Sequence, residues 1–205
     1  MLAVKEYVRP RALAYARRWA FARSPLFNDY SPFGGDCTNF VSQCLLAGSL
    51  VTNETPVFGW YYKSDGDRAP AWTGVEELYR FLTENTGTGP FGRVVGESEV
   101  APGDVVQLGR AEDDFYHTLL VMETGEGGIT VAAHTNDAFL RPLASYEYAL
   151  SRFIHIEGVR IFIPDATNVF YAYLEGRALP PTVPQATLTA PTPPVGEDGD
   201  AQNAE

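Results

Sequence analysis

The residue of this chain best suited to chemistry is Cys37, which stands where a helix is expected to begin. Two glycines, Gly34 and Gly35, precede it and give the backbone room to turn tightly. Apolar residues then recur at the spacing of one helix face: Phe40, Val41, Cys44 and Leu45. A thiol at a helix N-terminus lies at the positive end of the macrodipole, which favours the thiolate. The stretch therefore predicts a nucleophilic cysteine at the open end of a buried stripe.

The residues that flank this helix are expected to set its ends and the pKa of the thiol. Asp36 is a suitable N-cap, and Gly48 stands where the helix is expected to end. The negative charge of Asp36 opposes the dipole because it raises the pKa of the neighbouring thiol. If Asp36 caps Thr38 or Asn39, much of that charge is already engaged.

Two of the three histidines fall on the strands of an expected hairpin. The strands are predicted over residues 115–123 and 128–134, with the connection over residues 124–127. If that connection closes symmetrically over its middle residues, His117 lies directly opposite His134, with Cβ atoms roughly 5 Å apart. Asn136 follows two residues later on the same face. The hairpin is therefore expected to bring two histidines and an amide together.

A cysteine, a histidine and a polar partner form the arrangement that nucleophilic thiol catalysis requires. His117 would take the thiol proton of Cys37 and later return it to the leaving amine. His134, or Asn136 in its place, would fix the tautomer of His117 through the far ring nitrogen. The backbone N–H of Cys37 would help to hold the oxyanion. Each residue alone could be structural, as we expect for Cys44, but their coincidence favours catalysis.

Further elements are expected to position this centre. Helices are predicted over residues 9–23 and 72–84. Residues 100–108 are predicted to form a turn that runs into a strand, and residues 151–163 one or two strands, broken at Gly158. The intervening segment, residues 49–71, is predicted to be irregular. Its aromatic residues Trp60, Tyr61 and Tyr62 could line a substrate groove, although we favour a place at the edge of the core.

The composition changes near residue 177. From there the chain is rich in proline, threonine and alanine, and its last residues are acidic. Such a segment buries too little apolar surface to offset the entropy of ordering it. We therefore predict one domain over residues 1–176 and a disordered tail or linker over residues 177–205.

Charge and cysteine content exclude several classes of function. The formal net charge is -11, which disfavours binding to nucleic acid or to an anionic membrane through overall attraction. The two cysteines are expected two helical turns apart and therefore free. Neither the cysteine pair nor the histidine pair has the short spacing of a zinc site, and no P-loop or dinucleotide motif is present. No metal or cofactor is predicted.

No segment is long enough to span a membrane, so the chain as given is expected to be soluble and cytoplasmic unless an export signal has been removed.

Several motifs together resemble the putative amidase domain family, which belongs to the NlpC/P60 group of papain-like cysteine peptidases and amidases. The matching pieces run in order as follows: Asn28-x-Tyr30, Gly35-Asp-Cys-Thr-Asn-Phe-Val-Ser-Gln43, Ala47-Gly48, Trp60-Tyr61, Ala71-Trp72, Pro102-Gly-Asp-Val-Val-Gln, His117-Thr and His134-Thr-x-Asp137. The block around Cys37 is the most specific of them. The resemblance covers residues 8–163.

The resemblance implies a papain-like α+β fold in which the cysteine helix packs on a central antiparallel sheet. It implies Cys37 as nucleophile, His117 as base and His134 as third member, without a metal. Four further residues are candidates for the oxyanion or substrate site: Tyr30, Asn28, Asp36 and Trp60. The implied substrate is a peptide or amide, with the stem peptide of bacterial peptidoglycan as a candidate. Two alternatives keep the same site: a catalytically silent module that binds peptides or glycopeptides, and an acyltransferase that uses the same cysteine.

Overall fold

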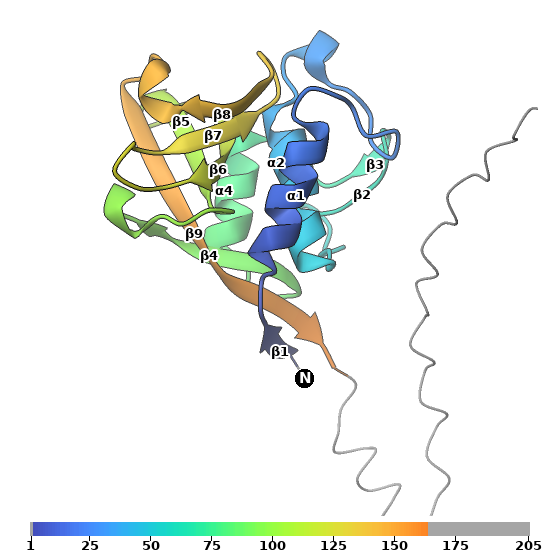
Figure 1. The fold of residues 1–205 in the computed structure, drawn as a ribbon. Coiled ribbons are helices and arrows are strands. Elements are labelled where there is room, and N and C mark those ends of the chain that lie inside the picture. Colours follow the sequence, from blue (N-terminus) through green and yellow to red (C-terminus); the bar gives the residue numbers. More distant parts are fainter. Residues whose placement is uncertain (1, 164–205) are drawn as a thin grey trace, which may run out of the picture. The chain divides into compact units, whose positions relative to one another are not determined.

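The computed structural model describes residues 2–163, which lie in one compact unit. They form an α+β fold, with one large antiparallel sheet and a group of helices packed against it (Figure 1). This confirms the predicted α+β class. The expected boundary at residues 176 and 177, and the predicted tail, lie outside the described residues.

The sheet has the order β1-β9-β5-β6-β7-β8, and β4 also pairs with β9. Its strands are β1 (Leu2–Lys5), β4 (Gly89–Val95), β5 (Val105–Ala111), β6 (Asp114–Glu123), β7 (Thr130–Ala133), β8 (Ala138–Pro142) and β9 (Leu150–Phe162). Each recorded pairing is antiparallel. The 13-residue strand β9 pairs with β1, β4 and β5, so it ties the two ends of the described chain into one sheet (Figure 1).

Four α-helices precede most of the sheet in the sequence. They are α1 (Arg9–Trp19), α2 (Cys37–Ser49), α3 (Pro70–Thr73) and α4 (Val75–Glu84). Short 3₁₀ turns lie at Ser31–Phe33, Glu97–Glu99 and Leu143–Ser145, and a small hairpin joins β2 (Tyr62–Ser64) to β3 (Asp67–Arg68). The helix predicted over residues 72–84 is interrupted at Gly74, whose extended backbone separates α3 from α4. Within residues 2–163, no helix is long and apolar enough to cross a membrane.

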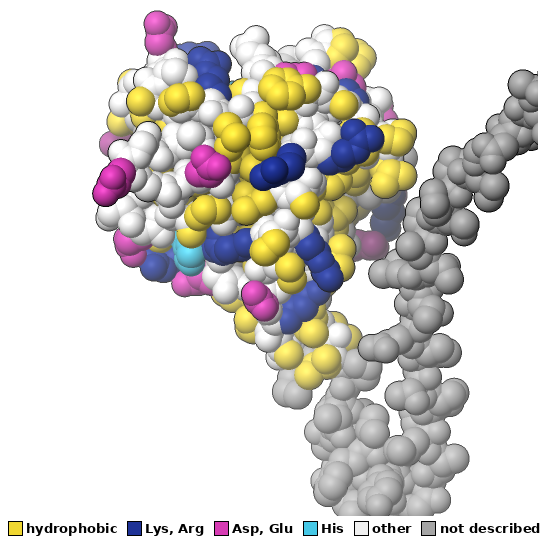
Figure 2. Space-filling model, viewed as in Figure 1, with side chains coloured by type: hydrophobic (Ala, Val, Ile, Leu, Met, Phe, Trp, Pro, Cys, Tyr) yellow, Lys and Arg dark blue, Asp and Glu magenta, His cyan; other side chains and the backbone are white. Residues whose placement is uncertain are grey.

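Helix α1 has basic residues in its last turn and no acidic residue in its first turn. Arg17 and Arg18 lie in its last turn, where they complement the negative end of the helix dipole. Its buried positions, Ala12 and Ala16, let it approach α2 closely. On the face that carries α1, basic side chains lie among hydrophobic ones (Figure 2).

The helices and one face of the sheet enclose the larger core. Its fully buried members include Phe40, Val41, Leu45, Trp60, Trp72, Leu78, Leu82, Leu120 and Ile154. The opposite face of the sheet holds a second cluster of Val106, Leu108, Leu119, Val121, Val131, Ala133 and Phe153. The prediction that Trp60 belongs to the core is confirmed, since its side chain is fully buried and donates a hydrogen bond from Nε1 to Ser42 at 3.0 Å.

Helix α2 is buried on nearly all sides, more than its expected single stripe. The polar side chains of its other faces are buried because aromatic residues supply their hydrogen bonds. Asn39 accepts from Trp72 Nε1 at 2.8 Å, and Gln43 accepts from the hydroxyl of Tyr15 at 2.8 Å. The helix that presents Cys37 is therefore held rigidly from several directions.

Gly48 does not end α2 as predicted. The helix continues to Ser49, and Leu50 takes the left-handed conformation that terminates it, with φ 53°. Gly48 has a different role, because an added Cβ there would overlap the ring of the buried Tyr7. The glycine therefore allows the segment before α1 to pack against the end of α2.

We predict that Gly48→Ala destabilises the fold. The gain in helix propensity is about 1 kcal/mol, whereas overpacking a well-filled core costs roughly 1–3 kcal/mol. Because the Tyr7 hydroxyl is also tied to the carbonyl of Gly103 at 3.2 Å, its ring has little freedom to move aside. A net loss of about 1–2 kcal/mol is expected from urea unfolding. Gly127→Ala is the matched control, since nothing lies within 4 Å of its added Cβ. A Gly48→Ala protein as stable as wild type would contradict the assignment.

Candidate active site

Cys37 and His117 line one pocket of about 590 Å³, here called the Cys37 pocket. Its other lining residues are Gly34, Gly35, Arg110, Tyr116, Thr135, Asn136, Arg141, Ser145, Tyr146 and Glu147. They come from the loop before α2, from β5 and β6, from the turn between β7 and β8, and from the end of β8 with the turn that follows. The structure thus brings the predicted nucleophile and base, together with Asn136, to one cavity.

Cys37 is the first residue of α2, and its side chain is 7% exposed. Burial raises the pKa of the Cys37 thiol, and hydrogen bonding to Thr118 and Thr38 only partly opposes this effect. The charge of Asp36 raises the pKa further, in the direction that the sequence predicts. The expected thiolate is therefore not the resting form, because desolvation outweighs the helix dipole. Both Cys37 and Cys44 are free, as predicted.

A chain of buried polar side chains fixes the start of α2 against β6. The hydroxyl groups of Thr38 and Thr118 are 2.9 Å apart, and Thr118 accepts a hydrogen bond from Gln107 Nε2 at 3.2 Å. Gln107 also donates to the carbonyl of Val75 at 2.8 Å. The sequence alone does not reveal this chain of hydrogen bonds, because its members come from separate elements and only the pairing of β5 with β6 aligns them.

His117 lies on β6 near two aromatic rings. The ring centroids of Tyr116 and Tyr146 lie 6.3 and 5.9 Å from that of His117. Burial lowers the pKa of His117 to about 4, and the positive charge of Arg141 adds to this effect. Within residues 2–163, no side chain or backbone group hydrogen-bonds to the imidazole. His117 is therefore a neutral base at neutral pH.

The predicted pairing of His117 with His134 is wrong. The turn closes with a hydrogen bond from Gly128 N to Gly125 O, which places Glu126 and Gly127 at its centre, one residue later than expected. A register shift between Val121 and Glu123 then moves the pairing again, giving the partners Leu120 with Ala132 and Val121 with Val131. Because side chains alternate along a strand, a slip of one residue moves a side chain to the other face.

His134 instead lies on the helical face of the sheet. Its ring stacks on Phe40, with centroids 4.0 Å apart, and it is 1% exposed. Nδ1 lies 2.6 Å from Asp36 Oδ2, and Nε2 lies 2.9 Å from the carbonyl oxygen of Trp19. Both ring nitrogens lie within hydrogen-bonding distance of an oxygen, so both are engaged. Since both are engaged, neither is available to orient His117.

Asp36 does not cap α2. Its backbone, with φ -117° and ψ 6°, is outside the extended region that a capping side chain requires, and it makes no capping bond. The carboxylate accepts hydrogen bonds from the amide of Tyr30 at 2.9 Å and from the side chain of Asn39 at 2.8 Å, besides its contact with His134. Its backbone N–H donates to the hydroxyl of Thr135 at 2.6 Å. Asp36 therefore anchors the loop that leads into Cys37.

Thr135 and Asn136 form the turn that closes β7 onto β8. Both have positive φ, at 62° and 68°, as the two central residues of a type I′ turn do. This conformation is costly for a β-branched residue such as Thr135. The strain is offset locally by its bond to Asp36, and it places Asn136 at the Cys37 pocket.

Comparison with known proteins decides the family. Residues 6–156 match the family described as putative amidase domain. The chain belongs to this family. Membership supports amide hydrolysis as the broad activity of the amidase domain, without defining its mechanism.

A relative of this amidase domain is found in Bacillus subtilis (strain 168), under the name Uncharacterized protein YhbB. The two are 31% identical over 140 residues, which are 66% of this chain and 44% of the relative. The chain therefore spans less than half of that protein. No solved structure matches the chain significantly.

Three further candidates lie outside the Cys37 pocket of the amidase domain. The hydroxyl of Tyr30 donates to Asp65 at 2.8 Å, and Asn28 also points to Asp65, at 3.4 Å from its Nδ2. Trp60 is a core residue. None of the three lines the Cys37 pocket, and each side chain is instead hydrogen-bonded around α2, so their place at the oxyanion or substrate site stays a prediction.

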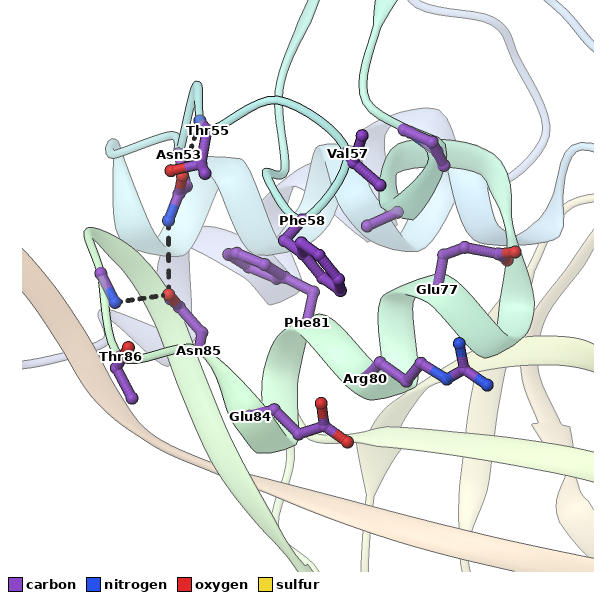
Figure 3. Close-up of a pocket in the computed structure, with 13 residues that line it drawn as sticks. Asn53, Thr55, Val57, Phe58, Glu77, Arg80, Phe81, Glu84, Asn85 and Thr86 are labelled. Atoms are coloured by element: carbon purple, nitrogen blue, oxygen red, sulfur yellow. Dashed lines mark hydrogen bonds between the residues drawn. The ribbon is translucent and has the colours of Figure 1, made fainter.

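A second pocket of about 590 Å³ lies against α4 and offers no comparable chemistry (Figure 3). It is lined by Asn53, Thr55, Val57, Phe58, Pro70, Ala71, Glu77, Arg80, Phe81, Glu84, Asn85, Thr86 and Gly87. Phe58 and Phe81 make its middle apolar, and it contains neither cysteine nor histidine. Across residues 2–163, no group of three or more His, Cys, Asp or Glu side chains is arranged to hold a metal ion.

We predict that His134→Ala lowers stability strongly, because it leaves the buried carboxylate of Asp36 without its closest partner. Leaving a buried polar group without its hydrogen-bond partner costs about 1–3 kcal/mol, measurable by denaturant unfolding. Asn136→Gly is the matched control. It keeps the positive φ of the exposed turn position, and a change within about 0.5 kcal/mol is expected. Unchanged stability of His134→Ala would show that the pair with Asp36 does not support the fold.

Proposed function

We propose that this amidase domain is a metal-independent thiol hydrolase of amide or peptide bonds, with Cys37 as nucleophile and His117 as general base. The observation that carries the proposal is their presence in a single pocket, with the thiol at the start of a rigidly held helix. Family membership supports amide hydrolysis. We further propose a papain-like arrangement of the NlpC/P60 type, in which a cysteine helix packs on an antiparallel sheet.

Because the Cys37 thiol and the His117 imidazole are both neutral before substrate binds, a general-base mechanism is favoured over a preformed thiolate–imidazolium pair. Cys37 is a neutral thiol and His117 a neutral imidazole, so the proton moves as the sulfur attacks. The Cys37 Sγ forms a bond to the acyl carbon while His117 accepts the thiol proton. The backbone N–H of Cys37, at the unsatisfied first turn of α2, would stabilise the oxyanion.

The remaining steps return both groups to their resting state. As the C–N bond breaks, His117 gives its proton to the leaving amine, and a thioester on Cys37 remains. Water then attacks the thioester while His117 removes its proton. The carboxylic product leaves as the C–S bond breaks, and the sulfur regains a proton from His117. Asn136, which lines the same pocket, is the candidate for orienting His117, while His134 acts through Asp36 as a positioning residue.

The size of the Cys37 pocket suits a peptide segment. Its volume of about 590 Å³ falls within the usual range for binding sites of small molecules. A stem peptide of bacterial peptidoglycan is the candidate substrate that we would test first.

One observation favours a second candidate, a silent module that binds peptides in the same pocket. The thiol and the imidazole are both neutral, and no described group holds the imidazole in place. Trapping of a covalent intermediate separates the two functions, since only the hydrolase forms a thioester.

The test of function compares a peptidoglycan digest and a panel of peptide amides treated with wild type, Cys37→Ala and Cys44→Ala. Wild type and Cys44→Ala are expected to release new amines, and intact mass spectrometry after acid quench should show an acyl adduct on Cys37. Cys37→Ala should lose activity by at least about 10³-fold. Cys44 is fully buried in the core, so its variant tests for effects of packing alone. Equal product release by Cys37→Ala would overturn the proposal, and release from peptide amides alone would remove the cell wall as substrate.

We predict that kcat/KM decreases to half of its plateau near pH 4 on the acid side of its pH profile. The reason is that kcat/KM reports the free enzyme, in which the pKa of His117 is lowered to about 4. Above that pH the imidazole is unprotonated and can accept the thiol proton. Below it, the protonated ring cannot. An acid limb near the ordinary histidine pKa of about 6.5 would contradict a desolvated base. The measurement is the initial rate at low substrate concentration across pH.

A further inference from the structure

The Cys37 pocket holds two arginines in a chain whose formal net charge is -11. Arg110 forms a surface ion pair with Asp114, with Nη1 and Oδ2 3.1 Å apart. Arg141 has no such partner, since none of the carboxylates in residues 2–163 forms an ion pair with it. Glu147 also lines the pocket, but it is exposed and does not bind Arg141. The pocket therefore contains one uncompensated guanidinium group.

Arg141 is held in place by neutral groups that leave its anion-binding edge free. Its Nε donates to the hydroxyl of Ser145 at 2.9 Å, and Nη2 donates to the carbonyl of Ser145 at 3.1 Å. The guanidinium lies 3.9 Å from the ring centroid of Tyr146, which stacks beneath it. These two bonds use the side-on edge of the planar group. The end-on edge, formed by Nη1 and Nη2, keeps the paired N–H donors that match a carboxylate.

This guanidinium lies beside the proposed catalytic base. Tyr146 contacts both side chains, since its ring centroid is also 5.9 Å from that of His117. Burial is the main cause of the lowered pKa of His117, and the charge of Arg141 lowers it further. A ligand that reaches Cys37 and His117 therefore passes within range of Arg141.

We propose that Arg141 binds a free carboxylate of the substrate, so that the Cys37 pocket selects amides that carry a carboxylate close to the scissile bond. The inference rests on the proposed function and adds the substrate class. A carboxylate would pair with the free edge of Arg141 in the two-pronged geometry that arginine favours. Neutral amides would leave the guanidinium uncompensated.

Binding of such a substrate would also change the base. Several titratable or charged groups line the pocket together with His117: Tyr116 on its own strand, Cys37 from α2, Arg110 from β5, and Arg141, Tyr146 and Glu147 from β8 and the turn beyond. Among them, Arg141 is the cation that lowers the pKa of His117. A bound carboxylate screens that cation, so His117 becomes a stronger base when the correct substrate is present.

The test uses two alkylating reagents that differ in charge, iodoacetate and iodoacetamide, on the full chain. The rate at Cys37 is read by peptide mass spectrometry, with Cys44 as an internal buried reference and glutathione as a free-thiol reference. The ratio of iodoacetate to iodoacetamide rates at Cys37 is expected to exceed that of glutathione by about tenfold, from one charge-assisted hydrogen-bonded pair. Arg141→Gln should lower this ratio by a similar factor and change the iodoacetamide rate little.

Arg110→Gln is the matched control, because its guanidinium is already paired with Asp114. Its reagent ratio is expected to stay within about twofold of wild type. A ratio that Arg141→Gln leaves unchanged, or that Arg110→Gln lowers equally, would overturn the assignment to Arg141.

A second measurement does not depend on the reactivity of Cys37. NMR titration of His117 in trifluoroacetate, whose carboxylate stays ionised over this range, compared with chloride at equal ionic strength, should show a higher pKa in trifluoroacetate for wild type and no such difference for Arg141→Gln. If Cys37 reacts no faster than Cys44 with either reagent, the proposed nucleophile is wrong, and the NMR result alone then decides whether Arg141 binds carboxylates. Identical His117 titrations in both salts would refute it.

Discussion

The buried pair of Asp36 and His134 is the interaction on which the geometry of the candidate site depends. One oxygen of Asp36 contacts His134, the other accepts from the backbone of Tyr30 and the side chain of Asn39, and the Asp36 amide is tied to Thr135. These contacts join the loop before α2, the helix itself and the turn between β7 and β8. A buried carboxylate is tolerated only when it is paired and fully hydrogen-bonded. The same bonds fix the backbone next to Cys37.

Much of the fold follows from patterns that the sequence displays directly. The helix from Cys37 follows from the glycine pair and the apolar spacing, and the hairpin strands follow from alternation and from the glycines between them. The placement of Trp60 in the core also follows from its aromatic surroundings. These features are local, so a single sequence contains the information that they require.

The register of the hairpin could not be obtained in the same way. It depends on which two residues occupy the turn and on an extra residue near Met122, and both choices are settled by packing against β5 and the helices. The same limit applies to Gly48, whose purpose appears only when Tyr7 is placed beside it. His134 shows the consequence for the site. An error of one residue converts a buried partner of Asp36 into an apparent partner of His117.

A nucleophile that rests as a neutral, buried thiol is protected chemically. Oxidants and general electrophiles react with thiolates, so a cysteine of raised pKa resists conversion to sulfenic acid and further oxidation. The burial of Cys37 therefore protects the thiol from oxidation, besides limiting its ionisation. Reaction would be fastest while a ligand fills the pocket beside His117, so Cys37 would survive longer between encounters with substrate than an exposed thiolate would.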